Sequence, residues 1–356
     1  SSLLEEIINN LGNDFPDIVS QPKKHRLQIL YTQIDRDKYN RPTFTTHGYR
    51  VREKEYFYPA STTKLPVAAL ALEKANLNSK INPYMRLEVL TERAELSGEF
   101  RDLSSESGYP SIAHYLRKLF IISDNTANNR LFEFLGRDHI NQRIWDLGYP
   151  NTRVRHRLSI HLSDELNGYT NPFTFYANGQ KVYEQPSKLA TLDLSVNYND
   201  YLIGQYHVSD GEKIKGPMDF SSKNFMSLKD QHAFMKQIVF PESVPSDRRL
   251  ALSDDDYSLL YREMSILPRQ SKYPKYKSSY YDGYCKFFMY GDSRDTIPDH
   301  IKIFNKVGQA YGFILDNAYI IDLENKVEFI LTAVVYHNNN ETINDNCLLY
   351  TSPSPR

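Results

Sequence analysis

An unbroken apolar stretch follows a short hydroxyl-rich segment, and the other elements are organised around it. Ser61-Thr62-Thr63-Lys64 leads directly into an apolar run at 65–72. This run is too short to span a bilayer and too uniformly apolar for a surface helix, so we expect a helix over about 61–76 that is buried on nearly all sides. Ser61 can satisfy free N–H groups at its start. Lys64 comes three positions later, which in helical geometry places its amine on the same face as the Ser61 hydroxyl.

Helical spacing of apolar residues recurs elsewhere along the chain. Apolar positions between Leu3 and Leu11 predict an amphipathic helix over 3–12. Capping and stop residues mark further helices, with Ser111 and Ser253 as caps and Gly136 as a stop. The remaining helices are expected over 85–95, 111–122, 126–135, 138–147, 228–240 and 254–266.

Strand patterns lie near both ends of the chain. Strands are expected over 26–34 and 43–50, over 300–308, and as an antiparallel hairpin over 312–322 and 326–337. Periodicity fades between 149 and 227, where we expect a long irregular excursion with short strands near 172–183. Helices in the middle and strands at both ends predict an α/β (α+β) fold, with an antiparallel sheet built from both termini and an inserted helical lobe.

We therefore expect a single domain over 1–345. Its α/β lobe takes about 1–56 and 250–345, and the helical lobe with the long insertion takes about 57–249. The last residues, 346–356, resemble a translated sequencing-adapter read-through, so we treat them as a non-native tail and exclude them from reasoning about the fold.

Composition narrows the class of protein. The chain has 356 residues, of which 40% are hydrophobic and 24% charged, and its formal net charge is −1, which argues against a general polyanion-binding role. We therefore expect no nucleic-acid partner. We also expect no transmembrane segment, because no run of eighteen apolar residues exists. Cys285 and Cys347 are too few for a disulfide framework. The histidines show no ligand spacing, so we expect no metal and no cofactor.

The residues that could carry chemistry begin with Ser61 and Lys64. A lysine held near an apolar core loses its charge more easily, because desolvation disfavours the ammonium form. A neutral lysine beside a serine is a base beside a nucleophile. The plain alternative is that Ser61 is only a helix cap, since Ser-x-x-Lys is a short pattern that also occurs at Ser20–Lys23.

Two further motifs follow in order along the chain. Ser123-Asp124-Asn125 stands at the end of a predicted helix, and Lys306-Val307-Gly308 lies on a predicted strand. Together with Ser61-Thr62-Thr63-Lys64 they resemble the S-x-x-K, S-D-N and K-T-G set of class A β-lactamases and penicillin-binding proteins. The resemblance implies a serine hydrolase of that fold, with its active site between the two lobes.

The resemblance also implies roles for the first two motifs. Ser61 would attack an amide carbonyl, with Lys64 accepting its proton. Ser123 would pass a proton to the leaving nitrogen, and Asn125 would hold the substrate amide and the Lys64 amine. For Ser123 and Asp124, helix capping is the plain alternative.

On the strand, the resemblance implies that Lys306 binds a substrate carboxylate beside Gly308. The backbone N–H groups of Ser61 and Gln309 would form the oxyanion hole. The plain alternative for Lys306 is a solvated strand lysine. Val307 departs from the family pattern, because a hydroxyl residue is expected there and would give the carboxylate one more hydrogen bond.

A second departure concerns hydrolysis of the acyl-enzyme. The family's deacylating glutamate lies in an E-x-E-L-N segment, but here Ser163 occupies its position in Ser163-Asp164-Glu165-Leu166-Asn167. Asp164 or Glu165 could substitute through a shifted loop; alternatively, Glu165 is only a surface charge. Without a base aimed at water, an acyl-enzyme could form and persist.

We therefore expect acyl transfer through Ser61 on a small-molecule or peptide substrate with a carboxylate, with β-lactam hydrolysis as the leading hypothesis. A D,D-peptidase or esterase of the penicillin-binding type is the first alternative. A non-catalytic ligand-binding or sensor domain is the second, and the 149–227 excursion would suit its partner surface. The resemblance implies a periplasmic or secreted protein. The physiological substrate and the oligomeric state stay open.

Overall fold

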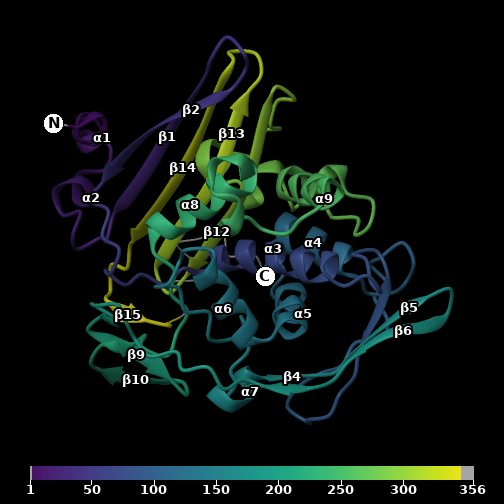
Figure 1. Ribbon diagram of the computed structural model, residues 1–356. Helices are drawn as coiled ribbons and strands as arrows, with labels where there is room; N and C mark the ends of the chain where they lie inside the picture. Colours follow the sequence, from purple (N-terminus) through teal and green to yellow (C-terminus); the bar gives the residue numbers. More distant parts are fainter. Residues whose placement is uncertain (1, 346–356) are drawn as a thin grey trace.

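A five-stranded antiparallel sheet, ordered β12-β13-β14-β1-β2, is built from both ends of the chain in the computed structural model, which describes residues 2–345 (Figure 1). Its strands are β1 (Gln28–Arg36), β2 (Pro42–Tyr49), β12 (Ile301–Ala310), β13 (Phe313–Asp322) and β14 (Val327–Tyr336). β1 joins the two ends of the chain, because it pairs with β2 on one side and with β14 on the other. The predicted sheet from both termini, and with it the α+β fold class, is confirmed.

Helices cover both faces of this sheet. On one side α8 (Leu228–Val239) packs on β1, β13 and β14, and α9 (Asp254–Ser265) packs on β12. α1 (Leu3–Asn10) contacts β2, and the turn η1 (Leu11–Asn13) joins it to α2 (Pro16–Ser20), so that α1 and α2 lie on the other side in Figure 1. The predicted caps of α9 and of α4 (Ile112–Ile121) are confirmed, since each serine hydroxyl accepts a backbone N–H of the first turn.

The predicted buried helix is α3 (Lys64–Asn76), which packs against α4 (Ile112–Ile121), α5 (Asn125–Leu135) and α6 (Arg137–Asp146). Its leucines Leu65, Leu70 and Leu72 are fully buried, and each contributes roughly 1.5–3 kcal/mol to folding. The start of the helix differs from the expectation. A 3₁₀ turn, η2 (Ala60–Thr63), precedes α3, and the N-cap of α3 is Thr63. The helix-cap alternative for Ser61 is therefore wrong.

One predicted helix is absent. Residues 85–95 contain β3 (Arg86–Val89), which pairs with β5 (Phe173–Ala177). Within β3, Leu87 and Val89 are buried while Arg86 and Glu88 are half-buried, which is the two-residue period of a strand. Four residues are too few to separate this period from a helical one, and the partner strand is far away in the sequence.

The 149–227 excursion contains the predicted short strands near 172–183 as β5 and β6 (Gln180–Gln185), together with a short helix, α7 (Asp164–Gly168). Its other strands are β4 (Tyr169–Thr170), β7 (Lys188–Leu189), β8 (Leu202–Ile203), β9 (Tyr206–Ser209), β10 (Glu212–Lys215) and β11 (Met218–Asp219). β9 also pairs with β15 (Thr342–Ile343), which follows the end of the main sheet.

Short turns form the connections from α8 to α9 and from α9 to β12. They consist of η3 (Pro241–Ser243), η4 (Ser246–Arg248), η5 (Pro268–Gln270), η6 (Asp282–Cys285) and α10 (Phe287–Tyr290). The division into two lobes stays a prediction; α8, which falls in the predicted helical lobe, packs on the sheet. Within residues 2–345, no helix is long and apolar enough to cross a membrane. The tail at 346–356, predicted to be non-native, lies outside the described residues.

Candidate active site

The third motif meets the first because β12 runs directly against the η2 turn. A Cβ atom added at Gly308 would lie 2.7 Å from the Pro59 carbonyl oxygen and 3.1 Å from the Ser61 nitrogen. Real Cβ atoms do not approach a backbone oxygen that closely, so only glycine lets the strand lie here. The contact places Gly308, and Gln309 after it, beside the backbone amide of Ser61.

The side chains of the motifs converge on Ser123. The Lys64 amine donates to the Ser123 carbonyl oxygen at 2.6 Å, to the Ser123 hydroxyl at 3.1 Å and to the Asn125 side-chain oxygen at 2.7 Å. From the opposite side, the Lys306 amine donates to the same Ser123 hydroxyl at 2.9 Å. The structure therefore brings together the side chains of Lys64, Ser123, Asn125 and Lys306. Of these, Lys64 follows Ser61 by three positions in the sequence.

Backbone strain stands beside two of these positions. Ser123 has φ +58°, and Ala60, directly before Ser61, has φ +48°. A non-glycine residue in this region costs of order 1–3 kcal/mol and persists where the surroundings hold it in place. Asp124, next along the chain, is the N-cap of α5 and accepts the Ala127 N–H at 2.8 Å, so the capping alternative holds for Asp124 but not for Ser123.

Burial lowers the pKa of both lysines. Lys64 is completely buried, and this burial, reinforced by the neighbouring Lys306 cation, lowers its pKa well below the usual value; Asp124 and Cys285 oppose the change. Burial also lowers the pKa of Lys306, to about 8, with Cys285 and Asp316 opposing. The lowered pKa favours the neutral, basic form of Lys64, and Lys306, with its pKa of about 8, is mainly a cation at neutral pH.

A model of the β-lactamase enzyme family matches residues 10–348 of the chain. The chain belongs to this family. No protein among the curated sequences matches it. The fold is similar to solved structures of β-lactamases from Desulfarculus baarsii DSM 2075 (14% identity, 96% of this chain and 93% of that one, TM-score 0.52) and Xanthomonas campestris (14%, 98% and 94%, 0.51). The structure of a β-lactamase from Burkholderia vietnamiensis is similar too (16%, 93% and 88%, 0.50).

In this β-lactamase family member, the loop over 153–168 contacts the motif network through Ser159. The Asn125 amide donates to the Ser159 hydroxyl at 2.7 Å. Ser163, at the position of the family's glutamate, is exposed and caps α7, where its hydroxyl accepts the Leu166 N–H. Asn167 is buried and its side-chain oxygen accepts the Arg157 N–H at 2.9 Å, so it stabilises the loop itself.

Neither candidate base joins the network. Asp164 pairs with Arg137 at 2.7 Å and its side chain is 87% exposed. Glu165 pairs with Arg93 at 2.9 Å and its side chain is 64% exposed. Both carboxylates therefore bind arginines on other elements. Their role as a deacylation base stays a prediction, and these contacts give it no support.

Several residues near the site were not expected from the sequence. Ser159 contacts Asn125 from the loop, and Cys285, Lys286, Asn305 and Asp316 are buried next to Lys306. One signal was present. Asp316 and Asn317 interrupt an apolar strand pattern, and a charged residue within such a strand indicates a paired or functional side chain.

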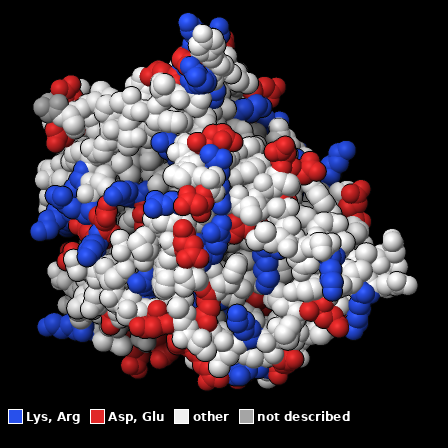
Figure 2. All heavy atoms as spheres, viewed as in Figure 1, with Lys and Arg blue, Asp and Glu red and all other residues white. Residues whose placement is uncertain are grey.

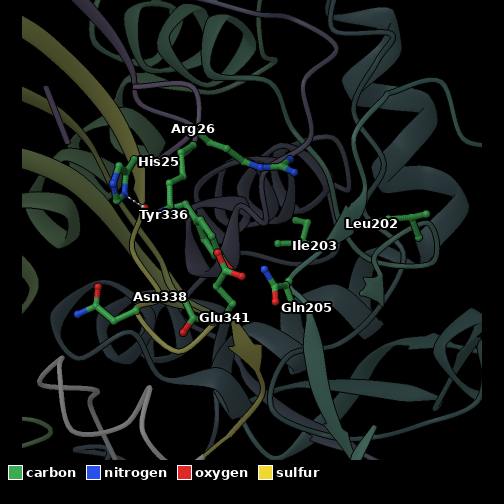
Figure 3. A pocket seen from close by; sticks show the side chains of 11 residues that line it. His25, Arg26, Leu202, Ile203, Gln205, Tyr336, Asn338 and Glu341 are labelled. Carbon is green, nitrogen blue, oxygen red and sulfur yellow. Dashed lines mark hydrogen bonds between the residues drawn. The ribbon is translucent and has the colours of Figure 1, made fainter. Parts of the chain in front are cut away.

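The hollows detected elsewhere on the surface lie apart from these motifs. A pocket of about 330 Å³ is lined by residues from 24–26, 202–205 and 336–341, including Arg26, Tyr336 and Glu341 (Figure 3). No motif residue lines it. On the face drawn in Figure 2, basic and acidic side chains are interspersed, without a patch of one sign. Within residues 2–345, no group of three or more His, Cys, Asp or Glu side chains could hold a metal ion.

Proposed function

We propose that this protein opens β-lactam rings by acyl transfer to Ser61. The family and the fold support a serine hydrolase of the β-lactamase type. The observation that supports the finer proposal is the buried Lys64 amine, one turn after Ser61 and 2.6–3.1 Å from Ser123 and Asn125. A buried amine that loses its proton easily is what a serine nucleophile needs as its base.

In the proposed acylation, the Ser61 hydroxyl oxygen bonds to the lactam carbonyl carbon while its proton moves to the neutral Lys64 amine. The carbonyl oxygen becomes an oxyanion, which the N–H groups of Ser61 and Gln309 would receive. The C–N bond then breaks, and Ser123 supplies a proton to the leaving nitrogen. The Lys64 amine, 3.1 Å from the Ser123 hydroxyl, then passes to Ser123 the proton that it took from Ser61. Each proton is thus accounted for, and both Lys64 and Ser123 return to their starting forms.

Lys306 would hold the substrate carboxylate as a cation. Its amine reaches the Ser123 hydroxyl at 2.9 Å, so a carboxylate bound by Lys306 would lie beside the proton-transfer group. Val307 offers no hydroxyl for a further hydrogen bond, so we expect weaker ground-state binding of the carboxylate than a threonine at this position would give.

A second candidate is a peptidase or esterase of the penicillin-binding type, which forms an acyl-enzyme with β-lactams but hydrolyses it slowly. The observation that favours it is the exposure of Asp164 and Glu165 and their pairing with arginines. Without a carboxylate at the network, the hydrolytic water lacks a general base, a contribution typically worth 10²–10⁴-fold in rate.

Intact-protein mass spectrometry during incubation with a penicillin tests both candidates. The proposed acylation predicts an adduct of the penicillin's mass that is absent in Ser61→Ala. An adduct that disappears with time supports a β-lactamase, and one that persists supports the slow-deacylation alternative. No adduct together with no consumption of penicillin in folded protein would overturn the proposal.

A further inference from the structure

The outer side of β12, behind Lys306, contains a second set of buried polar side chains. Successive residues of a strand point to opposite faces, so Asn305 lies on the face opposite to Lys306. Asp316 pairs across with Val307 and is therefore diagonal to Asn305 on the same face. Lys286, from the segment before β12, completes the set. The three side chains are only 2–4% exposed.

Hydrogen bonds link these three side chains into one chain of contacts. The Lys286 amine donates to the Asn305 side-chain oxygen at 2.6 Å and to the Met264 carbonyl at 2.7 Å. The Asn305 amide then donates to the Asp316 carboxylate at 3.0 Å and to the Cys285 carbonyl at 2.8 Å. Both ends of the Asn305 amide are thus occupied, which fixes its orientation.

Asp316 also fixes the backbone that carries Lys286. Its carboxylate accepts the N–H groups of Phe287 at 3.1 Å and Phe288 at 3.3 Å. The segment that precedes β12 is therefore bound to β13 through Asp316 and to β12 through Asn305. Since Asn305 is the residue directly before Lys306, these contacts restrain the strand at Lys306.

Burying such charges is costly. Next to them on this side of the sheet lies an apolar cluster that includes Ile303, Ala318 and Ile320. Burying an ammonium and a carboxylate beside such a cluster costs several kcal/mol per ion unless each is paired and hydrogen-bonded, and hydrophobic residues of similar size are often as stable. Stability alone therefore gives little reason for a lysine here.

The position of the charges suggests a reason. Asp316 and Cys285 are the groups that raise the pKa of Lys306 against the effect of its burial, and Lys306 in turn lowers the pKa of Lys286. Burial raises the pKa of the Cys285 thiol, and the charges of Lys306, Lys286 and Lys64 lower it. Charge on the outer side of β12 therefore acts on the lysine of the inner side.

We propose that Lys286, Asn305 and Asp316 are positioning residues that fix β12 at Lys306 and control the charge of its amine. Asp316 favours the charged form of Lys306, and Lys286 opposes it. The catalytic importance of Lys306 rests on the proposed function, but its titration does not.

Two variants that each remove one charge, and their combination, test this proposal. Lys286→Met should move the titration of Lys306 to higher pH by roughly one unit, and Asp316→Asn should move it to lower pH by a similar amount. The double variant should return close to the wild type. The titration is followed by NMR of ¹³C-labelled lysine, with the Lys306 signal assigned from Lys306→Arg. The pH profile of Ser61 acylation by a penicillin is followed in parallel.

Arg269→Met is the matched control, because Arg269 is a cation of the same segment that pairs with Asp282 at 3.1 Å. Losing the Arg269 guanidinium loosens the segment but leaves the charges of Lys286 and Asp316 in place, so the titration of Lys306 should not move. Shifts in the same direction for both charge variants, an equal shift in the control, or no shift in folded protein would overturn the proposal. If Asp316→Asn does not fold, Lys286→Met and Lys286→Gln against Arg269→Met still decide it. Absence of any acylation would refute the proposed function, while the NMR titration would still test the inference.

Discussion

The motif network around Ser123 and the loop over 153–168 differ in the burial of their charged side chains. In the network, Lys64 and Lys306 are buried and share Ser123 as a partner, and burial lowers the pKa of both. In the loop, the carboxylates of Asp164 and Glu165 stand in water and pair with arginines. Exposed pairs of this kind are worth little and perturb chemistry little.

This difference indicates a site suited to the first half of an acyl-transfer reaction. Forming the acyl-enzyme needs a base for Ser61 and a proton for the leaving nitrogen, and the network contains groups for both. Hydrolysing it needs a base beside water, and the loop presents only Ser159 to the network. Under the proposed function, this protein would therefore trap a β-lactam without turning it over quickly.

The largest expected effect comes from the base. Lys64→Met should lower the rate of Ser61 acylation by roughly 10³-fold, because it removes the proton acceptor and leaves Asn125 without the amine it binds. Stopped-time mass spectrometry of the penicillin adduct measures the rate.

Lys74→Met is the control for this variant. Lys74 lies at the other end of α3, and burial lowers its pKa to about 8 as well, but it binds Phe134 and Gln185 away from the motifs. Equal losses of the acylation rate in both variants would show that a buried lysine of α3 matters only for folding. The contrast between the motif network and the loop would then have no consequence for acylation.

The next effect tests the contact between β12 and the η2 turn. Gly308→Ala should lower acylation by roughly 10²-fold, because its methyl group would meet the Pro59 carbonyl at 2.7 Å and displace the strand from the Ser61 amide. Gly12→Ala adds a methyl at an ordinary 3.7 Å from Val19 and should change nothing. Full activity in Gly308→Ala would show that the oxyanion hole is not formed by these two segments.

Much of this site could be predicted from the sequence. The part that could not be predicted depends on contacts between residues that are far apart in the chain. Ser123, Asn125 and Lys306 were expected because each motif carries its chemistry within a few residues. The same holds for the sheet, whose strands show period-two patterns. The pairing of β3 with β5, and the contact of Lys286 with Asn305, join residues far apart in the chain, and no local pattern encodes them.

The pH dependence of acylation should reveal the two buried lysines directly. Lys306 is protonated below its pKa of about 8 and neutral above it. Since the charged form is the one that binds a carboxylate, the second-order acylation rate should fall as the pH rises through about 8, roughly tenfold by pH 9. On the acid side the rate should fall where Lys64 gains its proton, and the profile should be bell-shaped. A rate that stays constant up to pH 10 would contradict the role of Lys306.

The smallest effect should come from introducing a carboxylate into the loop over 153–168. Ser159 has φ +54°, a conformation that aspartate tolerates better than most residues, and its hydroxyl already accepts the Asn125 amide. Ser159→Asp should therefore place a carboxylate at the network and speed the loss of the adduct by roughly fivefold, well below the 10²–10⁴-fold of an evolved base. The decay of the adduct after removal of free penicillin measures this rate.

Ser163→Glu is the informative comparison, since it restores the family's residue at the position where the sequence lacks it. In this structure Ser163 caps α7 and is exposed, so the glutamate should leave the decay of the adduct unchanged and cost about 1 kcal/mol of stability through the lost cap. Faster decay in Ser163→Glu than in Ser159→Asp would mean that the loop approaches the acyl-enzyme in another arrangement. Faster decay in Ser159→Asp alone would show that the loop lacks a base only because Ser159, its contact to the network, carries no carboxylate.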